Sequence, residues 1–89
     1  MSGDWRPALA RSVVLRRDRV READLLLMPE RAVVLSGPGG RILRLCDGTR
    51  TRAQIVADLA PDFPDSPSTV IATDVEAFLT RIQEQGWVR

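Results

Sequence analysis

The stretch Leu25-Leu26-Leu27-Met28-Pro29-Glu30-Arg31-Ala32-Val33-Val34-Leu35 decides the fold of this 89-residue chain. It contains two short apolar runs, 25–28 and 32–35, separated by Pro29-Glu30, and Pro suits the first corner of a tight turn. Runs of about four residues between turn signals favour strands over helices. With the apolar run at 13–15, they predict a three-stranded antiparallel meander.

The segment after this stretch predicts a first helix. Ser36 can cap it, Pro38 suits its first turn, and Gly48 is expected to end it. The glycines around Pro38 are not followed by Gly-Lys-Ser/Thr, so a nucleotide-binding loop is disfavoured.

Two further helices are predicted downstream. The second runs from Thr51 to Leu59, and Thr51 with Gln54 forms a capping box at its start. The third opens at Ser66-Pro67 and closes at Gly86, after which Trp87-Val88 is expected to pack back. Its apolar residues recur at spacings of three and four, and we assign most of them to the core. They are Val70, Ile71, Val75, Phe78, Leu79 and Ile82.

The order of three strands followed by three helices predicts an α+β fold, with helices packed on one face of a small antiparallel sheet. Two short helices and a longer one beside a hairpin resemble a winged helix. We expect a single domain over residues 1–89, with residues 1–8 disordered.

Composition argues against an enzyme. The chain has no His, Tyr or Lys, so the commonest general base and metal ligand are missing, and no cofactor or metal is expected. The lone Cys46 fits a small buried side chain better than a nucleophile. The absence of a long apolar run or a signal-peptide core indicates a cytoplasmic protein without a membrane contact.

Charge is unevenly distributed. Residues 1–21 contain six Arg and two Asp, about +4, and the remainder is about −3, for a net charge of +1. Domains that bind nucleic acid are usually more basic. The N-terminal Arg cluster is either a solvated strand face and loop or a docking surface for an acidic partner.

The predicted sheet has two edges, and the run Ala32-Val33-Val34-Leu35 has no Pro, Lys or other guard against strand pairing. If this run is an edge, a peptide strand can add to it, with the third helix as the opposite wall of a groove. Its continuous apolar character also suggests that both faces are covered at least part of the time.

Three motifs resemble the PqqD family of pyrroloquinoline quinone (PQQ) biosynthesis. They are Leu26-Leu27-Met28-Pro29-Glu30-Arg31, then Ile42 to Thr51 with Cys46-Asp47-Gly48 at its centre, and Asp74-Val75-Glu76-Ala77-Phe78-Leu79. The similarity runs from near Pro7 to the C-terminus. Two places depart from the family pattern: Asp24 stands where the family often has Trp, and 37–40 is Gly-Pro-Gly-Gly instead of polar residues and alanines.

The resemblance implies a peptide chaperone. In that family the protein binds the leader of the precursor peptide PqqA as an added strand and delivers it to PqqE, a radical S-adenosylmethionine enzyme. Carried onto this chain, the implied peptide-binding residues lie on the third strand and the third helix. They are Ala32, Val33, Val34 and Leu35 on one wall and Asp74, Val75, Phe78 and Arg81 on the other.

Several alternatives stay open. Arg44 and Asp47 either fix the end of the first helix or contact the partner enzyme. The pathway is that of PQQ or of another ribosomally made, modified peptide. A winged-helix DNA-binding domain is disfavoured, because the second and third helices carry few arginines and several acids. A homodimer is a further possibility for a small domain with open edges.

Overall fold

The computed structural model describes residues 5–89, in which a small sheet is followed by helices. The strands are β1 (Val14–Asp18), β2 (Ala23–Met28) and β3 (Arg31–Leu35). The helices are α1 (Gly39–Leu45), α2 (Arg52–Leu59), the short 3-10 helix η2 (Ala60–Asp62) and α3 (Ser68–Glu84). The predicted α+β class and element order are confirmed.

The sheet is antiparallel, in the order β1-β2-β3, with Leu26 at its centre opposite Leu15 and Val33. β1 and β2 extend into the charged stretch 16–24 and pair as far as Asp18 and Ala23. Arginines fit these positions because one face of a small sheet meets water and β1 is an edge strand.

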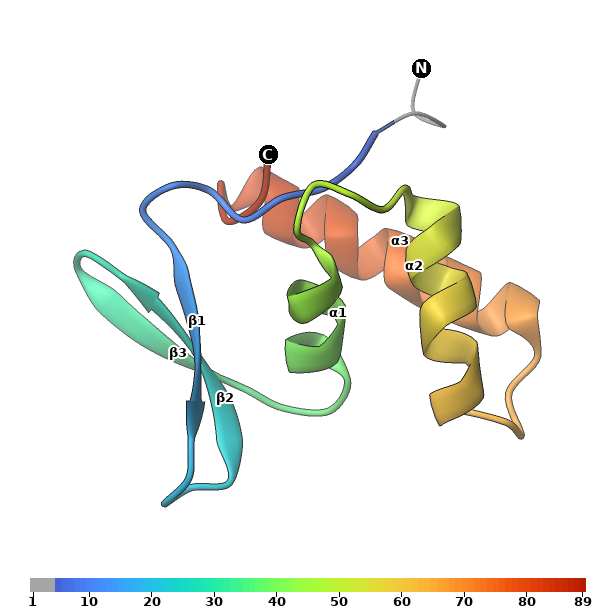
Figure 1. Ribbon diagram of the computed structural model, residues 1–89, viewed down its shortest axis with the longest axis horizontal. Helices are drawn as coiled ribbons and strands as arrows, with labels where there is room; N and C mark the ends of the chain where they lie inside the picture. The colour runs from blue at the N-terminus through green and yellow to red at the C-terminus, as the bar shows by residue number, and fades with distance from the viewer. Residues whose placement is uncertain (1–4) are drawn as a thin grey trace.

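The core lies between the sheet and the helices. The sheet stands at one end of the molecule and α2 at the other, with α1 between them, while α3 runs from the α2 end back toward the sheet (Figure 1). The central strand and all three α-helices contribute completely or almost completely buried side chains, which fixes their relative positions. The most buried are Leu26, Leu43, Ile55, Leu59 and Leu79.

The two ends of the described chain pair with each other. Ala8 and Arg89 exchange backbone hydrogen bonds of 3.1 and 2.8 Å, and Leu9 forms a bridge with Val88. Pro7 is fully buried. The disorder expected over 1–8 is therefore wrong for residues 5–8, while residues 1–4 lie outside the described part.

Of the two predicted helix caps, one is confirmed and one is wrong. The Thr51/Gln54 capping box is confirmed, with both reciprocal hydrogen bonds present. The Ser36 cap is wrong: Pro38 is the N-cap and makes no side-chain cap, because Gly37, at φ +60°, turns the chain first. α1 also ends at Leu45, before Gly48. In the described part, no helix has the length and apolar character to cross a membrane.

Candidate functional site

The outer edge of β3 is open. β3 pairs with β2 alone, so within residues 5–89 its second edge has no partner. Hydrogen-bonded pairs alternate along an antiparallel ladder. Counting from the pair Met28↔Arg31 that closes the two-residue turn, Ala32 and Val34 direct their N–H and C=O groups outward. The edge predicted for this run therefore exists, with four backbone groups free to pair.

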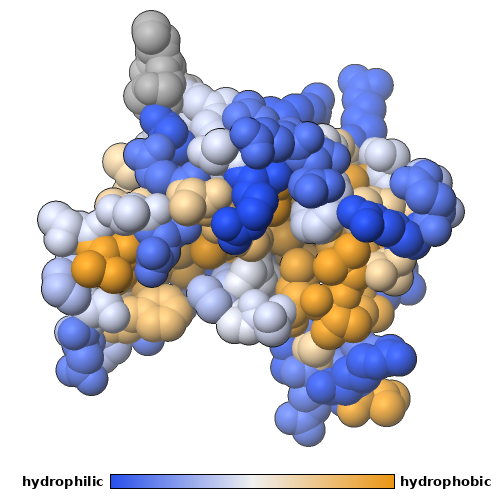
Figure 2. Space-filling view, turned by 180° about the vertical axis from the view of Figure 1, so that it is seen from behind, coloured by the Kyte–Doolittle hydropathy of each residue, from blue (hydrophilic) through white to orange (hydrophobic). Residues whose placement is uncertain are grey.

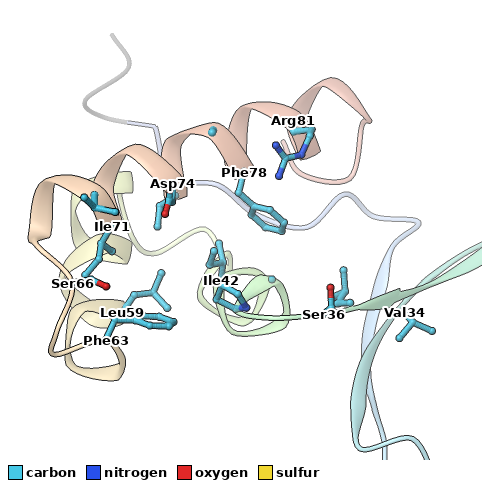
Figure 3. Close-up of a pocket in the computed structure, with 16 residues that line it drawn as sticks. Val34, Ser36, Ile42, Leu59, Phe63, Ser66, Ile71, Asp74, Phe78 and Arg81 are labelled. Atoms are coloured by element: carbon cyan, nitrogen blue, oxygen red, sulfur yellow. The ribbon is translucent and has the colours of Figure 1, made fainter.

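A groove of about 560 Å³ lies beside this edge, between the end of β3 and α3. Its floor comes from α1, α2 and α3, and Figure 3 shows these side chains converging from the three helices. The floor is apolar and closely packed, so it can receive apolar side chains without rearranging. Its buried members are Ile42, Leu59, Ile71 and Val75, each at most 7% exposed.

Six of the eight residues predicted for the groove line it. They are Val34, Leu35, Asp74, Val75, Phe78 and Arg81. Ala32 and Val33 lie earlier on β3 and do not line it. Val33 packs against the core because successive side chains alternate between the two faces of a strand.

Gly39 shapes the middle of the groove. A Cβ at this position would lie 3.4 Å from Cζ of Phe78 and 4.0 Å from Cβ of Leu35. The Phe78 ring therefore lies over the start of α1 at ordinary van der Waals distance from this position. This glycine belongs to the Gly-Pro-Gly-Gly segment that departs from the family pattern.

The far end of the groove was not predicted. Phe63, Ser66 and Val70 line it, and Phe63 is 37% and Val70 48% exposed. Val70 was assigned to the core by its spacing on α3, and the structure contradicts this. The sequence feature that could have indicated this end of the groove is Phe63 itself, an aromatic residue in the Pro-rich loop 61–67.

Two opposite charges stand on the α3 wall. Asp74 and Arg81 are both exposed, and neither forms an ion pair with another described residue. The Arg81 guanidinium lies over the Phe78 ring, 5.9 Å from its centroid. Figure 3 shows both side chains on the groove side of α3.

Arg44 and Asp47, considered as partner contacts, both bind within the chain. Arg44 donates to the carboxylate of Asp24, which is 8% exposed. Asp47 accepts from the Thr49 backbone at 2.9 Å and from Arg50 at 2.8 Å. These bonds hold the pKa of Asp47 below its ordinary value, chiefly through Thr49. The contacts favour local structural roles.

Cys46 is packed as a small apolar side chain. It is 2% exposed, and its thiol donates to the Ile42 carbonyl oxygen at 3.3 Å. Burial, reinforced by the neighbouring Asp47 charge, raises its pKa to about 12. The thiolate that nucleophilic catalysis needs is therefore scarce at neutral pH. In the part of the chain that the structure describes, no cluster of His, Cys, Asp or Glu could hold a metal ion.

The outer face of the sheet remains exposed. Val14 is 49% and Val34 55% exposed, so the rest of the described chain does not cover both faces of β3, contrary to the suggestion from the sequence. Figure 2 shows hydrophobic side chains over the sheet end, above the hydrophilic β1–β2 hairpin. In this hairpin Arg21 pairs with Asp18 at 2.8 Å, while Arg16 and Arg19 extend into solvent.

The fold matches solved structures along its whole length. The solution structure of the PqqD truncation of PqqCD from Methylobacterium extorquens, described as a functional and stand-alone RiPP recognition element, has a TM-score of 0.79. It is 31% identical, and the match covers all of this chain and 93% of that one. The matched fold, together with an open strand edge beside an apolar helical groove, places this chain in the class of RiPP recognition elements. RiPP stands for a ribosomally synthesized and post-translationally modified peptide.

The family follows from the sequence comparisons. The profile of coenzyme PQQ synthesis protein D (PqqD) matches residues 25–88, and the chain belongs to this family. A PqqA binding protein from Xanthomonas axonopodis pv. citri is 44% identical, covering all of this chain and 99% of the relative. One from Gluconobacter oxydans is 41% identical, covering 89% and 81%. The crystal structure of PqqD from Xanthomonas campestris is 37% identical, with a TM-score of 0.59 over all of this chain and 98% of that one.

Proposed function

We propose that this chain binds the leader of the PqqA precursor peptide as a fourth strand beside β3 and presents the peptide to PqqE, a radical S-adenosylmethionine enzyme. The observation that carries the proposal is the groove between the open edge of β3 and α3. The relatives described as PqqA binding proteins supply the identity of the peptide.

The backbone of β3 can hold a peptide independently of its sequence. Ala32 and Val34 offer two N–H donors and two C=O acceptors to an added strand. Each bond contributes about 1 kcal/mol net. Since every peptide has the same backbone, these bonds supply affinity and set the register but do not select the ligand.

Selection comes from the groove. A strand paired with β3 directs alternate side chains toward α3, where Phe78 and the buried floor residues Ile42 and Val75 lie. Apolar leader residues at every second position fit this floor, each stabilised by about 1.5–3 kcal/mol when fully buried. The other side chains face the exposed outer side of the sheet, beside Val34.

The short length of the site supports the proposed presentation of the peptide. β3 has five residues, so an added strand pairs over a similar length. The remainder of a longer precursor stays outside the groove and accessible to a second protein.

The direct test is a titration of the isotope-labelled chain with the PqqA peptide of Gluconobacter oxydans, followed by backbone NMR. Shifts are expected at Ala32, Val34 and Phe78. Val14, on the opposite edge strand, serves as the control and should not shift. Unchanged signals along β3 and α3 at saturating peptide would overturn the groove assignment.

Presentation needs its own measurement. A mixture of chain, PqqA peptide and PqqE should elute as one complex in gel filtration. A PqqE fraction that carries peptide without the chain, or none of either, would contradict the delivery role while leaving peptide binding intact.

A further inference from the structure

The groove has opposite charges at its two ends. Arg81 lines the groove on the α3 wall, and beyond the groove, at the start of β3, Arg31 lies over the Trp87 ring at 5.6 Å. Toward the other end Asp74 lines the groove, and Asp65 lies in the loop that forms its end wall. Within residues 5–89 none of these four charges forms an ion pair.

Most other charges on the helices are already engaged. Arg41 pairs with Asp62 at 3.1 Å, Arg50 with Asp58 at 2.9 Å, and Arg52 with Glu76 at 2.6 Å. Within the described chain, Arg41, Arg44 and Arg52 of the α-helices are paired, whereas Arg81 and Asp74 on the groove wall are not. An oppositely charged ligand group would meet little internal competition there.

We infer that the groove selects a peptide with a basic residue that contacts Asp74 and an acidic residue that contacts Arg81, the two contacts lying on either side of Phe78. This inference rests on the proposed peptide binding and adds the charge pattern of the ligand. Arg81 is oriented for the task because its guanidinium already lies over Phe78, leaving its N–H groups free for a carboxylate.

The spacing of the two charges sets the spacing in the peptide. Asp74 and Arg81 are seven residues apart on α3, which is about 10.5 Å along the helix axis. A strand advances about 3.3 Å per residue, so the complementary peptide residues are two to four positions apart. Two and four are the separations that place both side chains on one face of a strand.

Antiparallel pairing with β3 sets the direction of the peptide, and with it the order of its two charges. β3 and α3 run in opposite senses, since Arg31 at the start of β3 lies over Trp87, beyond the end of α3, and Leu35 meets Phe78 across Gly39. An antiparallel added strand, the more stable pairing, runs from the Asp74 end toward the Arg81 end. The basic residue therefore precedes the acidic one in the leader.

Binding of the Gluconobacter oxydans and Xanthomonas axonopodis PqqA peptides, measured by calorimetry at low salt, tests this. Arg81→Met keeps the apolar stem and removes the charge, and Asp74→Asn keeps the shape. Each should weaken binding about two- to fivefold. Arg19→Met on the hairpin and Glu84→Gln on α3, which do not line the groove, should change it less than twofold.

Peptide variants complete a double-mutant cycle, in which changes in the chain are combined with changes in the peptide. Each peptide carboxylate is changed in turn to its amide, and each Lys or Arg to Met. One carboxylate should lose its effect in Arg81→Met, and one basic residue two to four positions before it should lose its effect in Asp74→Asn. Unchanged peptide affinity in both variants would overturn the charge selection and leave strand addition standing. Failure of both peptides to bind the unmodified chain would instead overturn the proposed function.

Discussion

The carboxylate of Asp24 lies directly against Gly40. A Cβ at residue 40 would stand 2.6 Å from Cγ and 2.8 Å from Cβ of Asp24, closer than real side chains approach. Asp24 is held there by Arg44, with Arg17 at 3.7 Å. The two departures from the family sequence pattern, at 24 and at 37–40, therefore meet in space and join β2 to the first turns of α1.

Gly40→Ala tests this contact. In an unconstrained helix the change would stabilise by about 0.5–1 kcal/mol. Here the new methyl group collides with Asp24, and we expect the free energy of unfolding to fall by about 1–3 kcal/mol, measured by urea denaturation. Gly39→Ala is the control, since its Cβ meets Phe78 at an ordinary 3.4 Å. A stabilised Gly40→Ala variant would contradict the close packing.

The Cys46 thiol should be unreactive while the chain is folded. Burial raises its pKa to about 12, so at pH 8 almost none of it is thiolate. We expect a thiol-specific disulfide reagent to label the folded chain slowly, and the chain in concentrated guanidinium chloride stoichiometrically and fast. Equal labelling rates in the two states would mean that the C-terminal end of α1 is open.

Asp47 should make the fold sensitive to acid. Hydrogen bonds from Thr49, assisted by Arg50, hold its folded pKa below the ordinary value of 3.8. A lowered pKa stabilises the folded chain above the unfolded value, and this contribution disappears as pH falls through the folded value. Between pH 6 and pH 2 the urea midpoint should fall less in Asp47→Asn than in the unmodified chain.

Asp65→Asn is the matched control for this experiment. Asp65 is exposed and makes no side-chain hydrogen bond or ion pair with another described residue. Its variant should lose stability with acid as steeply as the unmodified chain. A parallel pH dependence for Asp47→Asn would show that the loop 47–50 contributes nothing to acid stability.

The sequence predicted the features that depend on local patterns. The turn at Pro29-Glu30 separates two apolar runs, the Thr51/Gln54 box fixes a helix start, and the apolar spacing of α3 marks a core face. Val34 and Leu35 could be placed because β3 follows this turn directly. The residues themselves suggested an open edge, while the resemblance to the PqqD family supplied its pairing with α3.

Features set by long-range packing could not be predicted. Ser36 has the composition of a cap, yet Gly37 redirects the chain before α1. Val70 follows the apolar spacing of α3 but lies beyond the area that the other helices cover, and is 48% exposed. The contact of Asp24 with Gly40 joins residues from two different elements, and no local pattern records it.

Phe63→Ala should weaken peptide binding while leaving the free energy of unfolding almost unchanged. Phe63 is 37% exposed at the end of the groove and is outside the buried core, so truncation should cost little folding free energy. An aromatic anchor at a binding surface commonly contributes 1 kcal/mol or more, so PqqA affinity should fall at least about fivefold. Val20→Ala, at a residue 95% exposed on the β1–β2 turn, should leave affinity unchanged. Full affinity in Phe63→Ala would limit the site to the β3 end.

Val34→Pro addresses strand addition itself. The Val34 N–H points away from β2, so proline can be accepted on this edge without breaking the β2–β3 ladder. It removes one donor for the incoming strand and places a ring in its path. PqqA affinity should fall at least about tenfold while the NMR spectrum stays folded. Val34→Thr keeps the donor and the shape and should bind within twofold. By contrast Val33→Pro removes an N–H that faces β2 and should unfold the sheet. Equal PqqA affinity in Val34→Pro and Val34→Thr would show that the peptide does not pair with this edge. The proline variant lacks the N–H donor at residue 34, so a peptide strand paired there would have to lose a hydrogen bond.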